Sequence, residues 1–253
     1  MRILLIRHAE PDYTIDSLTP KGWAEAELLG QRLVKVPVRD YYVSPLGRAR
    51  DTASRTLDKL GRTAEVLPWL QEFRGTVPDP ETGEHRYIAW DLKPRIWSAY
   101  PGIMDFRTWA DAPVFDRTNV REIWKETTDG VDELLGRYGF RKDGPVWLGE
   151  SNEPFAIALF CHFGISMAIL AYLTDMSPMV LWQRVLCMPS SVSEVVTEER
   201  IKGEVSFRIT KLGDLTHLEA AGENRSTAGL FPECFTGMDS TDPAENGSPV
   251  LPA

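Results

Sequence analysis

The sequence has few of the features that mark secreted or disulfide-bonded proteins. Its 253 residues include three cysteines, which are widely spaced and form no Cys-x-x-Cys motif, at positions 161, 187 and 234. This number and spacing exclude a disulfide framework and favour a reducing compartment. The N-terminus shows no long apolar segment followed by a cleavage site, so we predict no signal peptide and a cytoplasmic location.

Positive charge is scarce as well. The chain has 28 lysines and arginines against 37 aspartates and glutamates, for a formal net charge of −9. This balance argues against nucleic acid or an anionic membrane as a partner attracted by bulk charge. A negatively charged substrate would therefore have to meet cations that are gathered in one place.

One apolar stretch, residues 155–174, is long enough to be mistaken for a membrane span. His162 and Gly164 lie near its middle, and Pro154 precedes it. A buried strand, a tight loop and a buried helix explain this pattern better than a span does, so we predict no membrane insertion.

The first 70 residues alternate between strand and helix signals. The five predicted elements lie at residues 2–6, 20–34, 40–43, 45–61 and 64–67. Thr19 and Ser44 are the expected helix N-caps, each followed by a proline. A β-α-β-α-β pattern predicts a parallel or mixed sheet with right-handed crossovers.

The later elements extend this α/β pattern to about residue 221, which we take as a single domain. They are a helix at 120–138, strands at 145–148 and 155–161, a helix at 164–173, and a hairpin of 192–197 with 205–211. No internal repeat is found. Residues 222–253 are rich in Gly, Pro, Ser, Asn and acidic residues, so we expect a loosely packed or disordered tail.

Residues 68–119 differ from the rest because they are rich in Trp, Arg, Pro and Gly with weak periodicity. We predict that residues 74–119 form a cap-like insertion over the strand ends, where it would set substrate specificity. Its arginines are candidates for binding a second anionic group, at positions 74, 86, 95 and 107. The alternatives are that the arginines lie on the surface and that the tryptophans pack a small core.

Reactive side chains stand at the ends of four predicted elements. Arg7 and His8 end the first strand, Arg48 lies in the first turn of the second helix, and Glu72 follows the third strand. His162 ends the apolar strand at 155–161. Carboxyl ends of parallel strands share one sheet edge, so these residues could meet there. Two arginines, a helix N-terminus and two imidazoles together suit a phosphoryl group.

Several chemistries are open to this set. A neutral imidazole can attack phosphorus, and a carboxylic acid such as Glu72 can protonate the leaving alcohol. His8, His162 and Glu72 could instead form a two-His, one-carboxylate metal site, although two nearby arginines would repel a cation. Cys161 next to His162 suggests a thiol–imidazole pair, but neighbours on a strand point to opposite faces, so we interpret Cys161 as core.

The ordered motifs resemble the histidine phosphatase superfamily, which includes cofactor-dependent phosphoglycerate mutases and many small phosphatases. The matching segments are Arg7-His8-Ala9-Glu10, Leu18-Thr19-Pro20-Lys21-Gly22, Ser44 to Thr52 (SPLGRARDT), Leu70-Gln71-Glu72, Cys161-His162-Phe163-Gly164, Ser190-Ser191-Val192-Ser193 and Leu215-Thr216-His217-Leu218. They span about residues 1–220 in the family's order, which makes the combination specific.

The resemblance implies a three-layer α/β/α sandwich with a mostly parallel central sheet, as in phosphoglycerate mutases. It implies a phosphorylated His8, a phosphate pocket of Arg7, Arg48 and a protonated His162, and Glu72 as proton donor. Arg74 is added as a substrate-binding candidate. No metal or other cofactor is expected, and the expected partner is a small phosphorylated metabolite, with a homodimer left open.

The activity that the resemblance implies is hydrolysis of a small phosphomonoester, and two alternatives remain. One is phosphoglycerate mutase-type phosphoryl transfer, which is weakened because Phe73-Arg74-Gly75-Thr76 stands where mutases carry Arg-His-Tyr-Gly. The other is a module that binds a phospho-ligand without turnover. Pro11 also replaces a threonine that many members of the family carry, which removes one hydroxyl contact.

Overall fold

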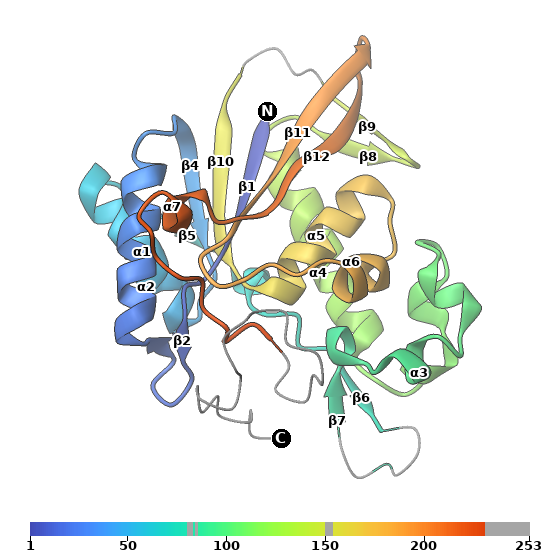
Figure 1. Ribbon diagram of the computed structural model, residues 1–253. Coiled ribbons are helices and arrows are strands. Elements are labelled where there is room, and N and C mark those ends of the chain that lie inside the picture. The colour runs from blue at the N-terminus through green and yellow to red at the C-terminus, as the bar shows by residue number, and fades with distance from the viewer. Residues whose placement is uncertain (80–82, 84–85, 150–153, 231–253) are drawn as a thin grey trace.

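The computed structural model describes residues 1–79, 83, 86–149 and 154–230, and an eight-stranded sheet runs through its centre (Figure 1). In spatial order its strands are β5 (Glu65–Val66), β4 (Val38–Val43), β10 (Ala156–Cys161), β1 (Arg2–Arg7), β11 (Val192–Ile201), β12 (Glu204–Asp214), β9 (Val146–Leu148) and β8 (Arg141–Asp143). The first strand of the chain therefore lies in the interior of the sheet, between strands that come much later.

The sheet is mixed, with two halves that meet at β1. Strands β5, β4, β10 and β1 are parallel to one another, whereas β11, β12, β9 and β8 are joined by antiparallel pairings. The α/β class is confirmed, but the expectation of a mostly parallel sheet holds only for the first half. The predicted hairpin is present, and it adds to β1 in the antiparallel sense and carries the second half.

Helices cover both faces of the sheet, as the three-layer prediction requires (Figure 1). Helices α1 (Pro20–Leu33) and α2 (Gly47–Leu60) lie on one face, while α4 (Val120–Gly136), α5 (Phe163–Thr174) and α6 (Pro178–Arg184) lie on the other. Alternate residues of β1 enter the two cores. Leu4 and Ile6 pack with α1 and α2, and Ile3 and Leu5 belong to the core that contains α5.

The starts of α1 and α2 show where local signals succeed and fail. Thr19 caps α1 as predicted, because its Oγ1 accepts from the Gly22 N–H at 3.0 Å and Pro20 begins the helix. The prediction that Ser44 caps α2 is wrong. The helix begins at Gly47, with Leu46 at the cap position, and the Ser44 hydroxyl lies 2.7 Å from His162 Nε2 instead.

The apolar stretch at 155–174 forms β10 followed directly by α5, so the strand–loop–helix interpretation is confirmed. Every residue of β10 is buried, because helices cover both of its faces. Within the described part of the chain, no helix combines the length and apolar character needed to cross a membrane.

The segment from 68 to 119 contains short elements only. They are η1 (Pro68–Leu70), β6 (Thr76–Pro78), β7 (Arg86–Ile88), η2 (Ala89–Asp91), α3 (Pro94–Trp97), η3 (Pro101–Met104), η4 (Trp109–Asp111) and η5 (Pro113–Phe115). Trp109 is 1% exposed and meets Trp124 of α4 and Trp182 of α6 edge-on, at centroid distances of 5.2 and 5.6 Å. Aromatic packing therefore fixes this segment against the helices of the second face.

The first part of the predicted tail is packed on the domain. Ser226 is fully buried, and its hydroxyl donates to Glu10 Oε2 at 2.5 Å. Gly229 lies so close to Arg7 that a Cβ would be 2.7 Å from the guanidinium Nη1. The prediction for residues 231–253 lies outside the described residues.

Candidate active site

The predicted reactive residues converge at the carboxyl ends of β1 and β10. These strands pair in parallel with Arg7 opposite Cys161, so His8 and His162 follow neighbouring strand ends. Their ring centroids are 5.1 Å apart, with an angle of 57° between the ring planes. Residues that are 154 positions apart in the chain are thus brought side by side by one pair of strands.

His8 is buried, and its tautomer is set by the backbone. Its Nδ1 lies 2.7 Å from the carbonyl oxygen of Ala9, which can only accept, so Nδ1 carries the hydrogen and Nε2 is bare. The His8 N–H donates to Cys161 O at 2.9 Å and fixes the backbone. Burial, reinforced by Arg7 and Arg48, holds the pKa of His8 well below its usual value, so the ring is neutral.

His162 is held by the hydroxyl of Ser44. The Leu46 N–H donates to Ser44 Oγ at 3.2 Å. The Ser44 hydroxyl is buried, and among the described residues its hydrogen has no acceptor other than His162 Nε2, so it donates there. The ring hydrogen is then on Nδ1, which is buried without a hydrogen-bond partner. Burial, then the charges of His8, Arg48 and Arg7, holds the pKa of His162 well below its usual value. The lowered pKa favours a neutral imidazole at His162, whereas the resemblance implied a protonated ring.

Arg7 is the buried cation of the pocket. Its Nη1 donates to the carbonyl of Cys187, and its backbone N–H donates to Ser191 O at 3.0 Å. The guanidinium carbon lies 5.7 Å from the centre of the Phe163 ring. Arg7 Nε is buried with no hydrogen-bond partner, so one donor of this guanidinium is left for a ligand.

Arg48 is positioned by Asp16, a residue that the sequence did not single out. Asp16 Oδ1 accepts from Arg48 Nη1 at 2.5 Å, and its Oδ2 accepts from the Gly47 N–H at 2.7 Å. One carboxylate thereby fixes both the start of α2 and the side chain in its first turn. Asp16 has φ of +48°, a conformation in which Asp and Asn are over-represented. Arg48 Nε is also buried without a partner.

Glu72 lies at the N-terminus of α5. Its Oε1 accepts from the N–H groups of Phe73 and Ile165, at 2.7 and 3.0 Å. Burial raises the pKa of this carboxyl above its usual value, and these hydrogen bonds and the two pocket arginines oppose the rise only in part. A carboxyl with a raised pKa is suited to donate a proton near neutral pH.

The insertion contributes Trp90 to the same place. A Cβ on Gly164 would lie 2.5 Å from Trp90 Cδ1 and 2.8 Å from Glu72 Oε1, so glycine is needed to leave room for both side chains. Trp90 also meets Phe163 edge-on, with ring centroids 5.9 Å apart. The indole therefore stands beside the candidate proton donor. The ring of Tyr13 lies 5.3 Å from the Arg48 guanidinium carbon.

The arginines of the insertion do not join this group. Arg74 is exposed, and its Nη2 pairs with Glu126 of α4 at 2.9 Å. Arg86, Arg95 and Arg107 are exposed as well. The substrate-binding role predicted for Arg74 thus finds no contact in the described residues that would support it.

The two competing chemistries also lack the required arrangement. In the part of the chain that the structure describes, no group of three or more His, Cys, Asp or Glu side chains is placed to hold a metal ion. Cys161 is fully buried with its Sγ 3.1 Å from Ser166 Oγ, and burial raises the pKa of this thiol to about 12. It belongs to the core, as predicted, and forms no pair with His162.

Three nitrogen atoms of the pocket share one property. Arg7 Nε, Arg48 Nε and His162 Nδ1 are all buried donors without a partner. Buried polar groups are nearly always hydrogen-bonded. These three belong to side chains that act on one imidazole, because the charges of Arg7 and Arg48 lower the pKa of His8 and the His162 ring lies 5.1 Å from it, so together they indicate a site for a ligand rich in acceptor oxygens. Such a ligand would be an anion, because two of the donors are cationic.

Comparisons with known proteins agree with this geometry. The family model for the histidine phosphatase superfamily (branch 1) matches residues 3–137. A protein of Hydrogenobacter thermophilus provisionally named phosphoserine phosphatase 2 is 27% identical over 226 residues, which cover 85% of this chain and 97% of that protein.

Solved structures share the fold at lower identity. A phosphoserine phosphatase variant from Entamoeba histolytica in complex with phosphoserine aligns with a TM-score of 0.57 and 17% identity, over 86% of this chain and 98% of that one. A mycobacterial glucosyl-3-phosphoglycerate phosphatase with inorganic phosphate aligns with a TM-score of 0.55 and 21% identity, over 85% and 98%.

Proposed function

The chain belongs to the histidine phosphatase superfamily, and on this basis we propose that it hydrolyses a small phosphomonoester through a phosphohistidine on His8, without a metal ion. The observation that carries the proposal is that three buried, unpartnered donors, Arg7 Nε, Arg48 Nε and His162 Nδ1, belong to side chains that act on the His8 ring, whose Nε2 is bare. Phosphoryl oxygens would satisfy all three donors at once.

In the first step His8 Nε2 attacks phosphorus in line with the bond to the leaving alcohol. The P–O bond breaks while a P–N bond forms, and protonated Glu72 gives its proton to the departing oxygen. Arg7, Arg48 and the Nδ1–H of neutral His162 stabilise charge on the three remaining oxygens. The raised pKa of Glu72 and the lowered pKa of His8 both favour the protonation states that this step needs.

In the second step water attacks the phosphohistidine. Glu72, now a carboxylate, accepts a proton from that water as the P–N bond breaks. Phosphate leaves, His8 returns to its neutral form with Nε2 bare, and Glu72 is protonated again. The cycle consumes one water and one phosphomonoester and returns every protein group to its starting state.

The leaving group would lie toward Trp90, which stands beside Glu72. The names of the relatives mention phosphoserine and glucosyl-3-phosphoglycerate, both small phosphomonoesters. The exposed arginines of the insertion supply no buried cation on this side, so we propose that the pocket holds its substrate mainly through the phosphoryl group and through apolar contact with the indole.

The test is turnover of p-nitrophenyl phosphate in excess EDTA, by the wild type and by His8→Ala. We expect the wild type to remain active and the variant to lose at least about 10³-fold in kcat, as for other covalent nucleophiles. Acid quenching during turnover should trap a phosphorylated wild type but an unlabelled His8→Ala protein. Equal activity of the two proteins, or loss of wild-type activity in EDTA, would contradict the proposal.

A substrate panel then separates hydrolysis from transfer. Phosphoserine, 3-phosphoglycerate, sugar phosphates and aryl phosphates should each be scored for phosphate release. A coupled mutase assay with a bisphosphate primer should show no turnover above hydrolysis. Faster transfer than hydrolysis would instead support the mutase-type alternative.

A further inference from the structure

One loop supports the backbone of both Arg7 and His8. In residues 187–191, which we call the platform loop, Cys187 O accepts from Arg7 Nη1 and Ser191 O accepts from the Arg7 N–H. The N–H of Ser190 donates to the His8 carbonyl at 2.9 Å. Since the opposite side of the His8 backbone is bound to Cys161, the platform loop completes the pair of hydrogen bonds that sets the direction of the imidazole.

Ser190 holds this position in an unfavourable conformation. Its φ is +60°, in the left-handed region that residues with a Cβ rarely adopt, and the residue is fully buried. A residue keeps such a conformation only where its surroundings over-determine it. The side chain shows what does so here, because Ser190 Oγ lies 3.0 Å from Nε2 of His217.

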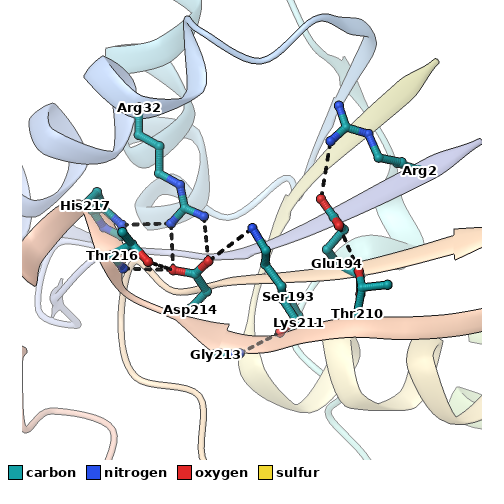
Figure 2. A network of polar contacts seen from close by, with 10 residues as sticks. All are labelled: Arg2, Arg32, Ser193, Glu194, Thr210, Lys211, Gly213, Asp214, Thr216 and His217. Carbon is teal, nitrogen blue, oxygen red and sulfur yellow. Dashed lines mark hydrogen bonds and ion pairs between the residues drawn. The ribbon is translucent and has the colours of Figure 1, made fainter. Parts of the chain in front are cut away.

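The tautomer of His217 follows from its other neighbour. His217 lies in α7 (Thr216–Glu219), and its Nδ1 is 3.4 Å from Arg32 Nη1 (Figure 2). A guanidinium can only donate, so Nδ1 accepts and the ring hydrogen is on Nε2, where it faces Ser190 Oγ. Burial and Arg32 lower the pKa of His217 to about 4, which keeps the ring neutral and the tautomer fixed near neutral pH.

Arg32 is itself anchored. Asp214 at the end of β12 accepts from both of its terminal nitrogens, at 3.1 and 2.8 Å, and also accepts from the N–H and hydroxyl of Thr216 (Figure 2). The contacts thus form a continuous series from α1 through Asp214 and His217 to the platform loop. The side chains of Arg32 and Asp214 are 22% and 14% exposed, and His217 and Ser190 are buried.

We propose that His217 is a positioning residue for the nucleophile: its Nε2–H bond to Ser190 Oγ fixes the platform loop in the conformation that aims His8 at phosphorus. This inference rests on the proposed role of His8. His217 touches neither the pocket donors nor Glu72, so its contribution is to the geometry of attack rather than to phosphate binding.

The test compares His217→Leu with His217→Gln. Leucine keeps the volume without the hydrogen bonds, whereas the glutamine amide can donate to Ser190 Oγ and accept from Arg32, as the histidine does. We expect His217→Leu to lower kcat about tenfold or more with KM within about twofold, because misplacement of a reacting group slows chemistry more than binding. His217→Gln should recover most of that loss. Arg208→Ala, which removes the exposed ion pair with Glu198, is the matched control and should match the wild type.

Two results would overturn the proposal. One is full activity of His217→Leu. The other is an equal loss of kcat in the leucine and glutamine variants, which would indicate a merely structural role. If His217→Leu does not fold, Ser190→Ala takes its place, because alanine keeps the backbone N–H and removes the Oγ. It should show the same loss of kcat, and adding His217→Gln to it should change nothing further; a wild-type kcat for Ser190→Ala would overturn the proposal.

His8→Ala in the same assay separates this inference from the proposed function. Activity retained by His8→Ala would refute the phosphohistidine mechanism itself. An inactive His8→Ala beside a fully active His217→Leu would leave that mechanism in place and remove only the positioning role.

Discussion

The pocket and the insertion use the same kinds of side chain in opposite ways. At the strand ends, Arg7 and Arg48 are buried or nearly so, and each is fixed by a directed contact, to the Cys187 carbonyl and to Asp16. In the insertion the arginines are on the surface, and the rings of Trp97 and Trp109 are inside. Buried positive charge is therefore found at the strand ends, where hydrogen-bond acceptors fix it. In the insertion, which has no part in the central sheet, the buried side chains are aromatic.

This contrast teaches that residue type alone does not locate a site. A buried arginine is stable only if its surroundings provide acceptors, which strand ends and helix starts do. An irregular segment gains its order from aromatic packing, and its cations are then best placed in water. Function in the insertion is accordingly expected from a ring that reaches the pocket, Trp90, and not from its arginines.

Among the substitutions that compare the pocket with the insertion, Glu72→Gln should lower kcat most. Loss of the proposed proton donor should lower kcat on alkyl phosphates about 10²- to 10⁴-fold, and less on p-nitrophenyl phosphate, whose leaving group needs little protonation. Burial raises the pKa of Glu72, so its acid form persists to higher pH, and the wild-type rate should fall as the pH rises through that value.

The acid side of the same pH profile belongs to His8. Its pKa is lowered, so the neutral nucleophile persists to lower pH, and the rate should fall only as the pH drops below that value. Glu72→Gln should therefore lose the alkaline limb of kcat for alkyl phosphates and keep the acid limb. An unchanged profile in the variant would assign proton donation to another group.

Asp16→Ala should have the next largest effect, because Arg48 and the start of α2 lose their shared anchor. We expect kcat/KM to fall about 10- to 100-fold with a raised KM, and stability to fall by about 1–3 kcal/mol, since charged hydrogen bonds are removed. Glu65→Ala, which removes an exposed ion pair with Arg137, is the control and should change neither quantity appreciably. Wild-type KM in Asp16→Ala would show that Arg48 needs no anchor.

Trp90→Ala and Trp97→Ala compare two tryptophans of the insertion, one beside the pocket and one in the core. Trp90 stands beside Glu72, so its removal should lower kcat/KM about tenfold for substrates with apolar leaving groups and less for small polar ones. Trp97 is 7% exposed, so Trp97→Ala should lower the free energy of unfolding by about 3–5 kcal/mol. Its kcat/KM should be unchanged at temperatures where the protein is folded. The same activity loss in both variants would mean that the insertion acts only as a packed unit.

The smallest effect is expected for Arg74→Ala. Its guanidinium is exposed and paired with Glu126, so kcat/KM should change less than about twofold and stability by less than about 1 kcal/mol. Arg48→Ala, measured beside it, should lose phosphate affinity. A raised KM for anionic substrates in Arg74→Ala would restore its predicted role and break the contrast between the two regions.

The sequence predicted the parallel half of the fold well, because strand and helix periodicity are local properties and β-α-β connections have few solutions. The helix start at Ser44-Pro45 was misjudged for a physical reason. The local pattern of a cap was present, but the hydroxyl is engaged by His162, which is 118 positions away. No local signal can report such a partner.

The residues of the candidate site likewise include some that the sequence could predict and some that it could not. His8, Arg48, Glu72 and His162 could be predicted because each follows a strand or begins a helix, and those ends share one edge. Asp16, Ser190 and the contact of Trp90 could not. Asp16 and Ser190 depend on positive φ angles, and all three depend on contacts with segments distant in the chain. The role of Arg74 could not be judged from the sequence, because an arginine near a motif is equally stable in a surface ion pair, such as the one it forms with Glu126.

The position of β1 inside the sheet has a consequence for the order of folding. Arg2 pairs with Ala156 on one side and with Val196 on the other, so the strand that leads to the proposed nucleophile is synthesised first but finds both of its partners late in the chain. Contacts of such high sequence separation slow folding, because long loops must close before the two pairings of β1 can form. Phosphate binding should therefore appear only when both pairings of β1 have formed, and its recovery during refolding would report that step of assembly.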